Sequence, residues 1–183
     1  MFVNKSKIRS KILKLRKKNS NKNFKIDTDK FFSFFKKKKY NLKNFGGYYP
    51  SNCEIDDLEI LNLLAKKNYN ISLPIVRKNN QMDFFKWSSN DPLKINKYGI
   101  PEPVSSKISY PEILFVPLVG YDSDLNRLGY GGGFYDRYID KIEKNKKIIK
   151  IGLAFSHQRL NKVPISLHDK KLDFIMTEKG ILK

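Results

Sequence analysis

The chain has 183 residues, of which 40% are hydrophobic and 13% aromatic, so it is long enough to bury one core of ordinary size. It contains no run of eighteen apolar residues and no secretory signal at its start, so we expect neither a membrane span nor export. One cysteine and two histidines exclude a disulfide within the chain and a Cys/His metal cage, so any metal must be held by oxygen. We expect a single cytoplasmic domain over residues 1–183.

The net charge of +19 is typical of proteins that bind nucleic acid, but its distribution weakens that interpretation. Residues 1–44 contain sixteen Lys or Arg and two Asp, which is +14 of the total. Thirty-one of the 37 cations are lysines, a bias that we attribute to an AT-rich genome and that indicates a solvated surface. Nucleic acid is therefore an unlikely partner. The six arginines are more informative, because a guanidinium is a planar fork for phosphate or carboxylate.

The first part of the chain has the apolar spacing of helices around one short strand. Thr28 and Asp56 are the expected N-caps of the second and third helices, because a short polar side chain there can accept from a free backbone N–H group. In chain order we expect a helix over residues 5–18, a helix over 29–39, a strand and turn over 45–50, and a helix over 56–68.

The second part of the chain, from residue 71 onward, is predicted to contain mainly strands. The run EILFVPL, residues 112–118, is continuously apolar, which favours a central buried strand. Around it we expect strands over 71–76 and 82–87, an extended segment over 97–105, a helix ending near 144, and strands over 148–155 and 173–178. This alternation predicts an α/β fold: an open, mostly parallel sheet covered by helices on both faces, in three αβα layers.

A glycine-rich segment, RLGYGGGFYDRY at residues 127–138, lies between the central strand and the next helix. In open α/β sheets, ligands bind outside the carboxyl ends of the strands, and a glycine-rich helix entry can present several N–H groups to a phosphate. The segment has no G-K-[ST] ending and no correctly placed third glycine, so it is neither a Walker A loop nor a dinucleotide fingerprint. Phosphate binding is the favoured interpretation, and tight packing at a helix entry is the alternative.

The longer segment LVGYDSDLNRLGYGGGFYDRY, residues 118–138, resembles the signature of the 5-formyltetrahydrofolate cyclo-ligases, also called 5,10-methenyltetrahydrofolate synthetases. The resemblance extends over nearly the whole chain. It is supported, in order, by the KxxxR of Lys5 and Arg9, YYPSNCEID at 48–56, Trp87, YGIPEP at 98–103, GLAFSHQ at 152–158 and HDKKLDFIMTE at 168–178.

This resemblance implies a ligase that uses MgATP to convert 5-formyltetrahydrofolate to 5,10-methenyltetrahydrofolate, with release of ADP and phosphate. ATP would phosphorylate the formyl oxygen, the second amine nitrogen of the folate would close the ring, and phosphate would leave. The partners implied are a reduced folate and ATP, with Mg²⁺ as cofactor. Such a reaction needs cations and amides around the phosphoryl group, a metal, and a pocket for a flat pterin. A nucleic-acid-binding module and a different small-molecule kinase or ligase are the alternatives.

Lys5, Arg9 and Arg16 fall within about 40° of one another on a helix, so they form a cationic stripe. On the residues alone, an ordinary basic surface helix is the favoured interpretation of the stripe. The resemblance implies that ATP is bound by Lys5, Arg9, Arg127, Leu128, Gly129, Tyr130, Gly131, Gly132, Gly133, Phe134 and Tyr135. It also implies catalytic roles for Arg127, Asp136 and Arg137 and metal ligation by Asp136 and Asp169, with Asp173 as a reserve candidate.

For the folate, the resemblance points to Tyr49, Glu54 and Trp87, with residues 130–134 (Tyr130, Gly131, Gly132, Gly133 and Phe134) as a wall of the same pocket. An aromatic ring can stack on a pterin, and a carboxylate can accept from its amino-pyrimidine N–H groups. Tyr49 and Trp87 could instead be core residues. At Phe134 many relatives have a tyrosine, so a hydroxyl is missing here. His157 and His168 are interpreted as structural.

Overall fold

The computed structural model describes residues 4–20, 22, 24–38, 40 and 42–183. Its helices are α1 (Lys5–Lys18), α2 (Thr28–Lys38), α3 (Leu58–Lys66) and α4 (Phe134–Glu143), with the short 3₁₀ helices η1 (Lys78–Asn80) and η2 (Ser156–Gln158). Its strands are β1 (Asn44–Gly46), β2 (Asn70–Val76), β3 (Met82–Lys86), β4 (Leu93–Ile95), β5 (Pro101–Pro103), β6 (Ile108–Ser109), β7 (Ile113–Pro117), β8 (Gly120–Tyr121), β9 (Arg127–Leu128), β10 (Ile149–Leu153), β11 (Phe174–Thr177) and β12 (Gly180–Leu182).

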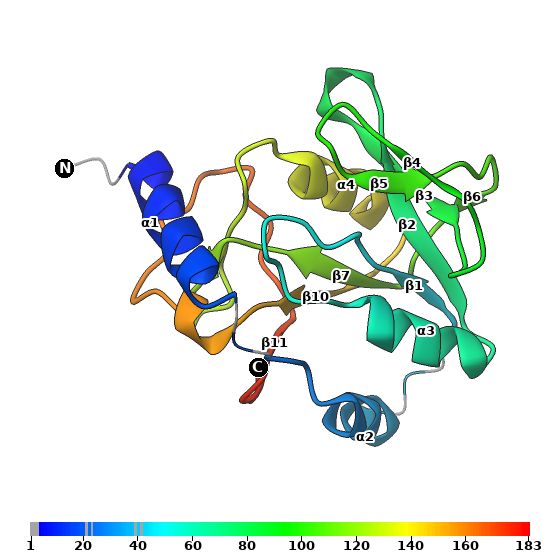
Figure 1. Cartoon of the computed structure of the whole chain (residues 1–183), viewed down its shortest axis with the longest axis horizontal. Helices are drawn as coiled ribbons and strands as arrows, with labels where there is room; N and C mark the ends of the chain where they lie inside the picture. Colours follow the sequence, from blue (N-terminus) through cyan, green and yellow to red (C-terminus); the bar gives the residue numbers. More distant parts are fainter. Residues whose placement is uncertain (1–3, 21, 23, 39, 41) are drawn as a thin grey trace.

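Eight strands form one mixed sheet in the order β12-β11-β10-β7-β1-β2-β3-β6 (Figure 1). The five inner strands from β11 to β2 run parallel. Strands β12 and β3 are antiparallel to their inner neighbours, and β6 pairs antiparallel with β3 at the edge. Strand β7 lies between β10 and β1, so the prediction of a central strand is confirmed. The remaining strands pair as two small antiparallel ribbons, β4 with β5 and β8 with β9.

Side chains that alternate along β7 build two hydrophobic cores, one on each face of the sheet. Ile113 and Phe115 belong to the core that contains residues of α2 and α3. Leu114 and Val116 belong to the core that contains Ile139 and its neighbours on α4. Because both faces are covered, the predicted α/β fold with helices on both sides is confirmed. In the described part of the chain, no helix is long and apolar enough to cross a membrane.

Two helices begin differently from the sequence prediction. Asp27, not Thr28, caps α2, because the Lys30 N–H group donates to the Asp27 carboxylate at 3.0 Å and Thr28 is already helical. Helix α3 begins at Leu58, later than predicted. The Asp56 carboxylate still accepts from the Leu58 N–H group at 2.8 Å, so it serves the first helical residue. Residue 39, the predicted end of the second helix, lies outside the described residues.

The segment after β1 leaves the sheet early. Within the strand and turn predicted over 45–50, the strand is limited to Asn44–Gly46, because the Tyr48 N–H group donates to the buried Asp57 carboxylate at 3.0 Å instead of to a neighbouring strand. The chain then forms an irregular loop over residues 48–54, which we call the 48–54 loop. This loop lies at the carboxyl end of the parallel strands, where the fold predicts a ligand.

Candidate functional site

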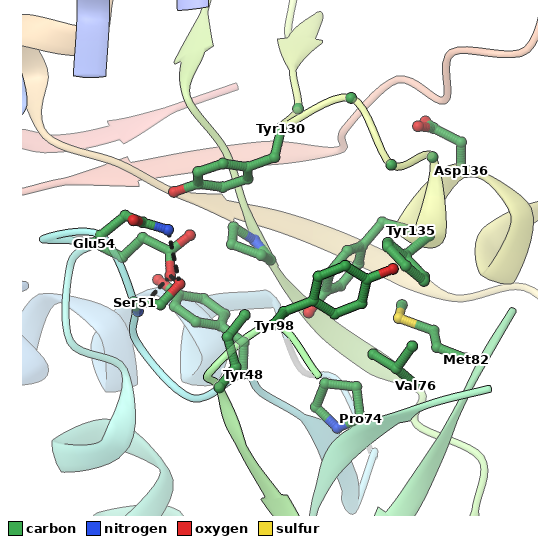
Figure 2. Close-up of a pocket in the computed structure, with 18 of the residues that line it drawn as sticks. Tyr48, Ser51, Glu54, Pro74, Val76, Met82, Tyr98, Tyr130, Tyr135 and Asp136 are labelled. Atoms are coloured by element: carbon green, nitrogen blue, oxygen red, sulfur yellow. Dashed lines mark hydrogen bonds between the residues drawn. The ribbon is translucent and has the colours of Figure 1, made fainter. Parts of the chain in front are cut away.

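A cavity of about 670 Å³ opens at the carboxyl ends of the parallel strands. One wall is apolar and includes Pro74, Val76, Met82 and Tyr98; Figure 2 shows their side chains facing the same space. The opposite wall is polar and consists of α1, the 48–54 loop and the glycine loop, which we define as residues 129–133. The cavity brings together almost all the predicted site residues: Lys5, Arg9, Tyr49, Glu54, Asp136, Asp169 and every residue from 127 to 135.

The glycine loop has a backbone that few other residues could adopt. Gly131 and Gly133 have φ angles of +104° and +67°, in the left-handed region that favours glycine. A Cβ atom on Gly132 would lie 2.6 Å from the Phe134 ring. Gly133 is the N-cap of α4 and has no side chain to cap the helix. The first N–H groups of α4 therefore lack a capping side chain and are available to an anion.

The cations of α1 face this loop. The Arg9 Nε atom donates to the Gly129 carbonyl at 2.7 Å, and its guanidinium lies against Gly131. The Lys5 ammonium donates to the Asp169 carboxylate at 2.6 Å. Arg16 continues the predicted stripe, but it is buried beneath Tyr130 and does not line the cavity. Arg9 and Arg16 therefore contact the glycine loop and Lys5 contacts the loop before β11, so the stripe is not an ordinary basic surface.

Arg127 and Asp136 form the most buried ion pair of the cavity. Their Nη2 and Oδ1 atoms are 2.6 Å apart, and the Arg127 side chain is only 4% exposed. The Arg127 Nε atom is buried without a hydrogen-bond partner among the described residues. A buried donor without a partner costs free energy, so the guanidinium has capacity to bind a further acceptor such as a phosphate oxygen.

Asp136 and Asp169 line the same cavity from α4 and from the loop before β11. The Lys170 N–H group donates to Oδ1 of Asp136 at 2.9 Å, the same oxygen that Arg127 contacts, so Oδ2 is left for other ligands. Mg²⁺ is usually held by one or two carboxylates together with waters and substrate phosphates. The described residues contain no cluster of three His, Cys, Asp or Glu. The pair therefore fits a magnesium ion that is completed by a nucleotide, not an all-protein metal cage.

Glu54 is the cavity carboxylate that is predicted from the sequence resemblance to bind folate. It accepts from the Ser51 N–H group at 2.7 Å, and Figure 2 shows the Tyr130 hydroxyl directed toward it as a further possible donor. Burial raises the pKa of Glu54 above its ordinary value, while these hydrogen bonds and the charge of Arg16 act in the opposite direction. A half-buried carboxylate with this support can accept hydrogen bonds from a flat heterocycle in the cavity.

Three predicted site residues lie elsewhere. Trp87 is buried in the hydrophobic core and is not on the cavity wall. Arg137 lines a second, adjoining cavity, where it donates to the carbonyls of Asn80 and Gly132 and so supports the glycine loop. The reserve candidate Asp173 accepts from the Lys150 N–H group at 2.7 Å and ties two strands together.

The two histidines also lie outside the main cavity. The His157 ring stacks on Phe155 with centroids 5.3 Å apart, and His168 lines the second cavity.

Sequence reasoning did not select several residues of the apolar wall. Tyr98 lies on the turn between β4 and β5, and its ring meets Phe134 edge to face with centroids 5.8 Å apart. The sequence did contain an indication for Tyr98, because this residue begins the YGIPEP stretch that supports the family resemblance. Pro74 and Met82 carried no signal, since an apolar residue near a strand end is equally suited to the core.

These features define a class of protein: an α/β protein in which one cavity combines a glycine-rich loop, cations and carboxylates with aromatic side chains. The sequence model of the 5-formyltetrahydrofolate cyclo-ligase family matches residues 2–178. The chain therefore belongs to the 5-formyltetrahydrofolate cyclo-ligase family, and it is an enzyme of that family.

Individual relatives agree with this assignment. A 5-formyltetrahydrofolate cyclo-ligase of Haemophilus influenzae is 34% identical over 71% of this chain and 73% of its own length. A probable 5-formyltetrahydrofolate cyclo-ligase of Schizosaccharomyces pombe is 30% identical over 68% of this chain and 69% of its own. The structure of a 5,10-methenyltetrahydrofolate synthetase from Aquifex aeolicus superposes with a TM-score of 0.76, at 27% identity, over 98% of this chain and 92% of that one. The family supports the predicted conversion of 5-formyltetrahydrofolate to methenyltetrahydrofolate.

Proposed function

We propose that this enzyme uses ATP and Mg²⁺ to convert 5-formyltetrahydrofolate to 5,10-methenyltetrahydrofolate, with release of ADP and phosphate, in the cytoplasm. One observation carries the proposal: one cavity brings together the glycine loop, its cations Lys5, Arg9 and Arg127 and the carboxylates Asp136 and Asp169, which we call the phosphate wall, and a set of aromatic and apolar side chains. A nucleic-acid-binding module would explain neither the glycine loop nor the two carboxylates beside it. A different small-molecule kinase would share the phosphate wall, but membership of the family favours a folate as the second substrate.

The phosphate wall would hold the triphosphate of ATP. Lys5 and Arg9 are positioned by α1, Arg127 by β9, and the amides by the glycine loop. Preorganised cations and amides stabilise the charge that spreads over the transferred phosphoryl group. Asp136 and Asp169 would hold Mg²⁺, which neutralises phosphate charge and orients the γ-phosphoryl group when it is bound.

The chemistry itself requires little from acid or base side chains. The formyl oxygen attacks the γ-phosphorus, and ADP leaves with the electrons of the broken P–O bond. The second amine nitrogen of the folate then attacks the formyl carbon, loses its proton and closes the ring. Finally the C–O bond breaks and inorganic phosphate departs, which leaves the methenyl cation. The work of this chain is to hold the two substrates in line and to exclude water.

The folate would lie between Tyr49, Glu54 and the glycine loop, with Tyr98 and Phe134 as aromatic walls. Glu54 would accept hydrogen bonds from the amino-pyrimidine edge of the pterin. Because Trp87 is in the core and Arg137 is bound to backbone carbonyls, we assign them to supporting the pocket and the loop, not to contacting substrate.

Purified protein with 5-formyltetrahydrofolate and MgATP is expected to produce the methenyl chromophore, which is followed by its absorbance. The signal should disappear without ATP or with EDTA, because the phosphoryl transfer needs both nucleotide and metal. Release of one ADP for each ring closed is the matching stoichiometry. Equal chromophore formation in the presence of EDTA would contradict the metal and phosphoryl assignment.

Replacing Arg9 by alanine is expected to raise the KM for ATP about tenfold or more, with little change in the KM for folate. The physical reason is that a charge-assisted phosphate contact is worth about 1.5–3 kcal/mol, and that Arg9 also holds the Gly129 carbonyl. Lys7→Ala, an exposed cation of the same helix, is the matched control. Unchanged ATP kinetics in Arg9→Ala would remove α1 from the proposed nucleotide site.

A further inference from the structure

Arg16 is an unusual residue for the last turn of an amphipathic helix. It is only 1% exposed and is among the largest fully buried side chains of the protein. The salt bridges of the described residues include none to Arg16. Burying a guanidinium without a direct carboxylate partner is costly, so its neighbours must compensate for the lost water.

Its contacts all lie at the floor of the polar wall. Arg16 Nη1 donates to the Leu118 carbonyl, just beyond β7, at 3.2 Å. Arg16 Nη2 donates to the Tyr130 hydroxyl at 2.5 Å, and the guanidinium carbon lies 5.5 Å from the centre of the Tyr130 ring. The Nε atom is buried without a partner among the described residues. Arg16 is therefore aimed at the sheet end and at Tyr130, not at solvent.

The Tyr130 hydroxyl lies between the Arg16 guanidinium and the Glu54 carboxylate. A phenol that accepts from a guanidinium still has its own proton to donate, and the neighbouring Glu54 carboxylate is an acceptor for that proton. Figure 2 shows the Tyr130 ring lying across the cavity, with its oxygen directed to the side where Glu54 and Ser51 lie. The Ser51 N–H group holds the same carboxylate from the 48–54 loop at 2.7 Å.

We propose that Arg16 is a positioning residue of the folate site: through the Tyr130 hydroxyl it fixes the orientation of the Glu54 carboxylate and makes it a better acceptor for the substrate. The inference rests on the proposed role of Glu54 in folate binding. It assigns Arg16 to the folate half of the cavity, although the helical stripe groups it with the ATP-binding cations Lys5 and Arg9.

The charges around Glu54 predict that the effect of Arg16 on folate binding depends on pH. Burial raises the pKa of Glu54, and the Tyr130 hydrogen bond and the charge of Arg16 lower it. The other titratable groups acting in this region are Tyr48, Tyr135 and Asp57, and burial raises the pKa of each, which favours their uncharged forms. The charge of Arg16 thus favours the ionised form of Glu54. Without it, Glu54 takes up a proton at a higher pH.

The test is Arg16→Met, which keeps a long apolar side chain in the buried space and removes the charge and both donors. We expect the KM for 5-formyltetrahydrofolate to rise about tenfold, the KM for ATP to stay within about twofold, and the acid limb of kcat/KM for folate to move to higher pH. Arg16→Lys should restore part of the folate affinity and of the pH profile. Lys17→Met, an exposed neighbour on α1, is the control and should resemble the parent protein.

Tyr130→Phe keeps the proposal testable if Arg16→Met does not fold, because it removes only the hydroxyl that links Arg16 to Glu54. It should reproduce the folate defect and the shifted acid limb, and in a folded double variant the two effects should not add. A rise in the ATP KM alone, or an unchanged acid limb in both variants, would overturn the inference while leaving the proposed function intact. Failure of the parent protein to close the folate ring would instead overturn the proposed function.

Discussion

Replacing Asp136 by asparagine is expected to lower turnover at least about 100-fold while folate affinity stays close to that of the parent protein. The asparagine oxygen can still accept from Arg127 and from the Lys170 N–H group, so the start of α4 and the loop before β11 keep their contacts. The substitution removes the negative charge of residue 136, and with it one of the two proposed carboxylate ligands of Mg²⁺. Chromophore formation measures turnover, and calorimetric titration with 5-formyltetrahydrofolate measures affinity.

Asp140→Asn supplies the matched control. Asp140 lies one turn further along α4, is more exposed, and pairs with Lys170 at 2.6 Å. The Asp140→Asn variant loses the same charge from the same helix, but residue 140 does not line the main cavity. The turnover of this variant should therefore stay near that of the parent. If Asp136 only complements the helix dipole, its substitution costs about 0.3–1 kcal/mol of stability and leaves turnover nearly unchanged. An Asp136→Asn variant as active as Asp140→Asn would therefore remove Asp136 from the site.

The parts of the fold that the sequence predicts correctly are those set by local pattern. Strand β7 is a continuous apolar run, and α1 and α4 have clear helical spacing next to recognisable turns. The β8–β9 ribbon was missed because two-residue strands have no periodicity to detect. This ribbon makes the glycine loop begin at a hairpin, which positions Arg127 beside α4 rather than directly at the end of β7.

The candidate site was predictable where a residue's neighbours in sequence are also its neighbours in space. The glycine loop and Asp136 meet this condition, and they line one cavity. Trp87 does not, because an aromatic side chain after a strand suits a core and a pterin pocket equally well, and only packing decides. Arg16 differs again: helical geometry puts it on the cationic stripe, but nothing local indicates that Tyr130 covers it. Its burial depends on contacts with residues more than a hundred positions away.

Glu54→Gln is the second change for which we expect a large effect, this time on the folate side. The amide keeps the size of the side chain but replaces an ionised acceptor by a neutral group that carries two donors. Charge-assisted hydrogen bonds to the pterin are each worth about 1.5–3 kcal/mol, so the KM for 5-formyltetrahydrofolate should rise about 100-fold. The KM for ATP should change little, because the ATP contacts come from α1 and the glycine loop. Steady-state kinetics with each substrate varied in turn measures both.

The pH dependence gives this variant a signature that a general loss of structure would not produce. In the parent protein, folate binding needs ionised Glu54, so it should weaken as the pH falls through the pKa of Glu54, which burial raises above the ordinary value of 4.5. The substituted amide does not titrate, so this acid limb of kcat/KM should be absent from the variant. Glu59→Gln, at an exposed position of α3 where the side chain pairs with Lys25 at 3.2 Å, should keep both the limb and the parent KM. An acid limb that persists unchanged in Glu54→Gln would assign the titration to another group and leave Glu54 without a role in folate binding.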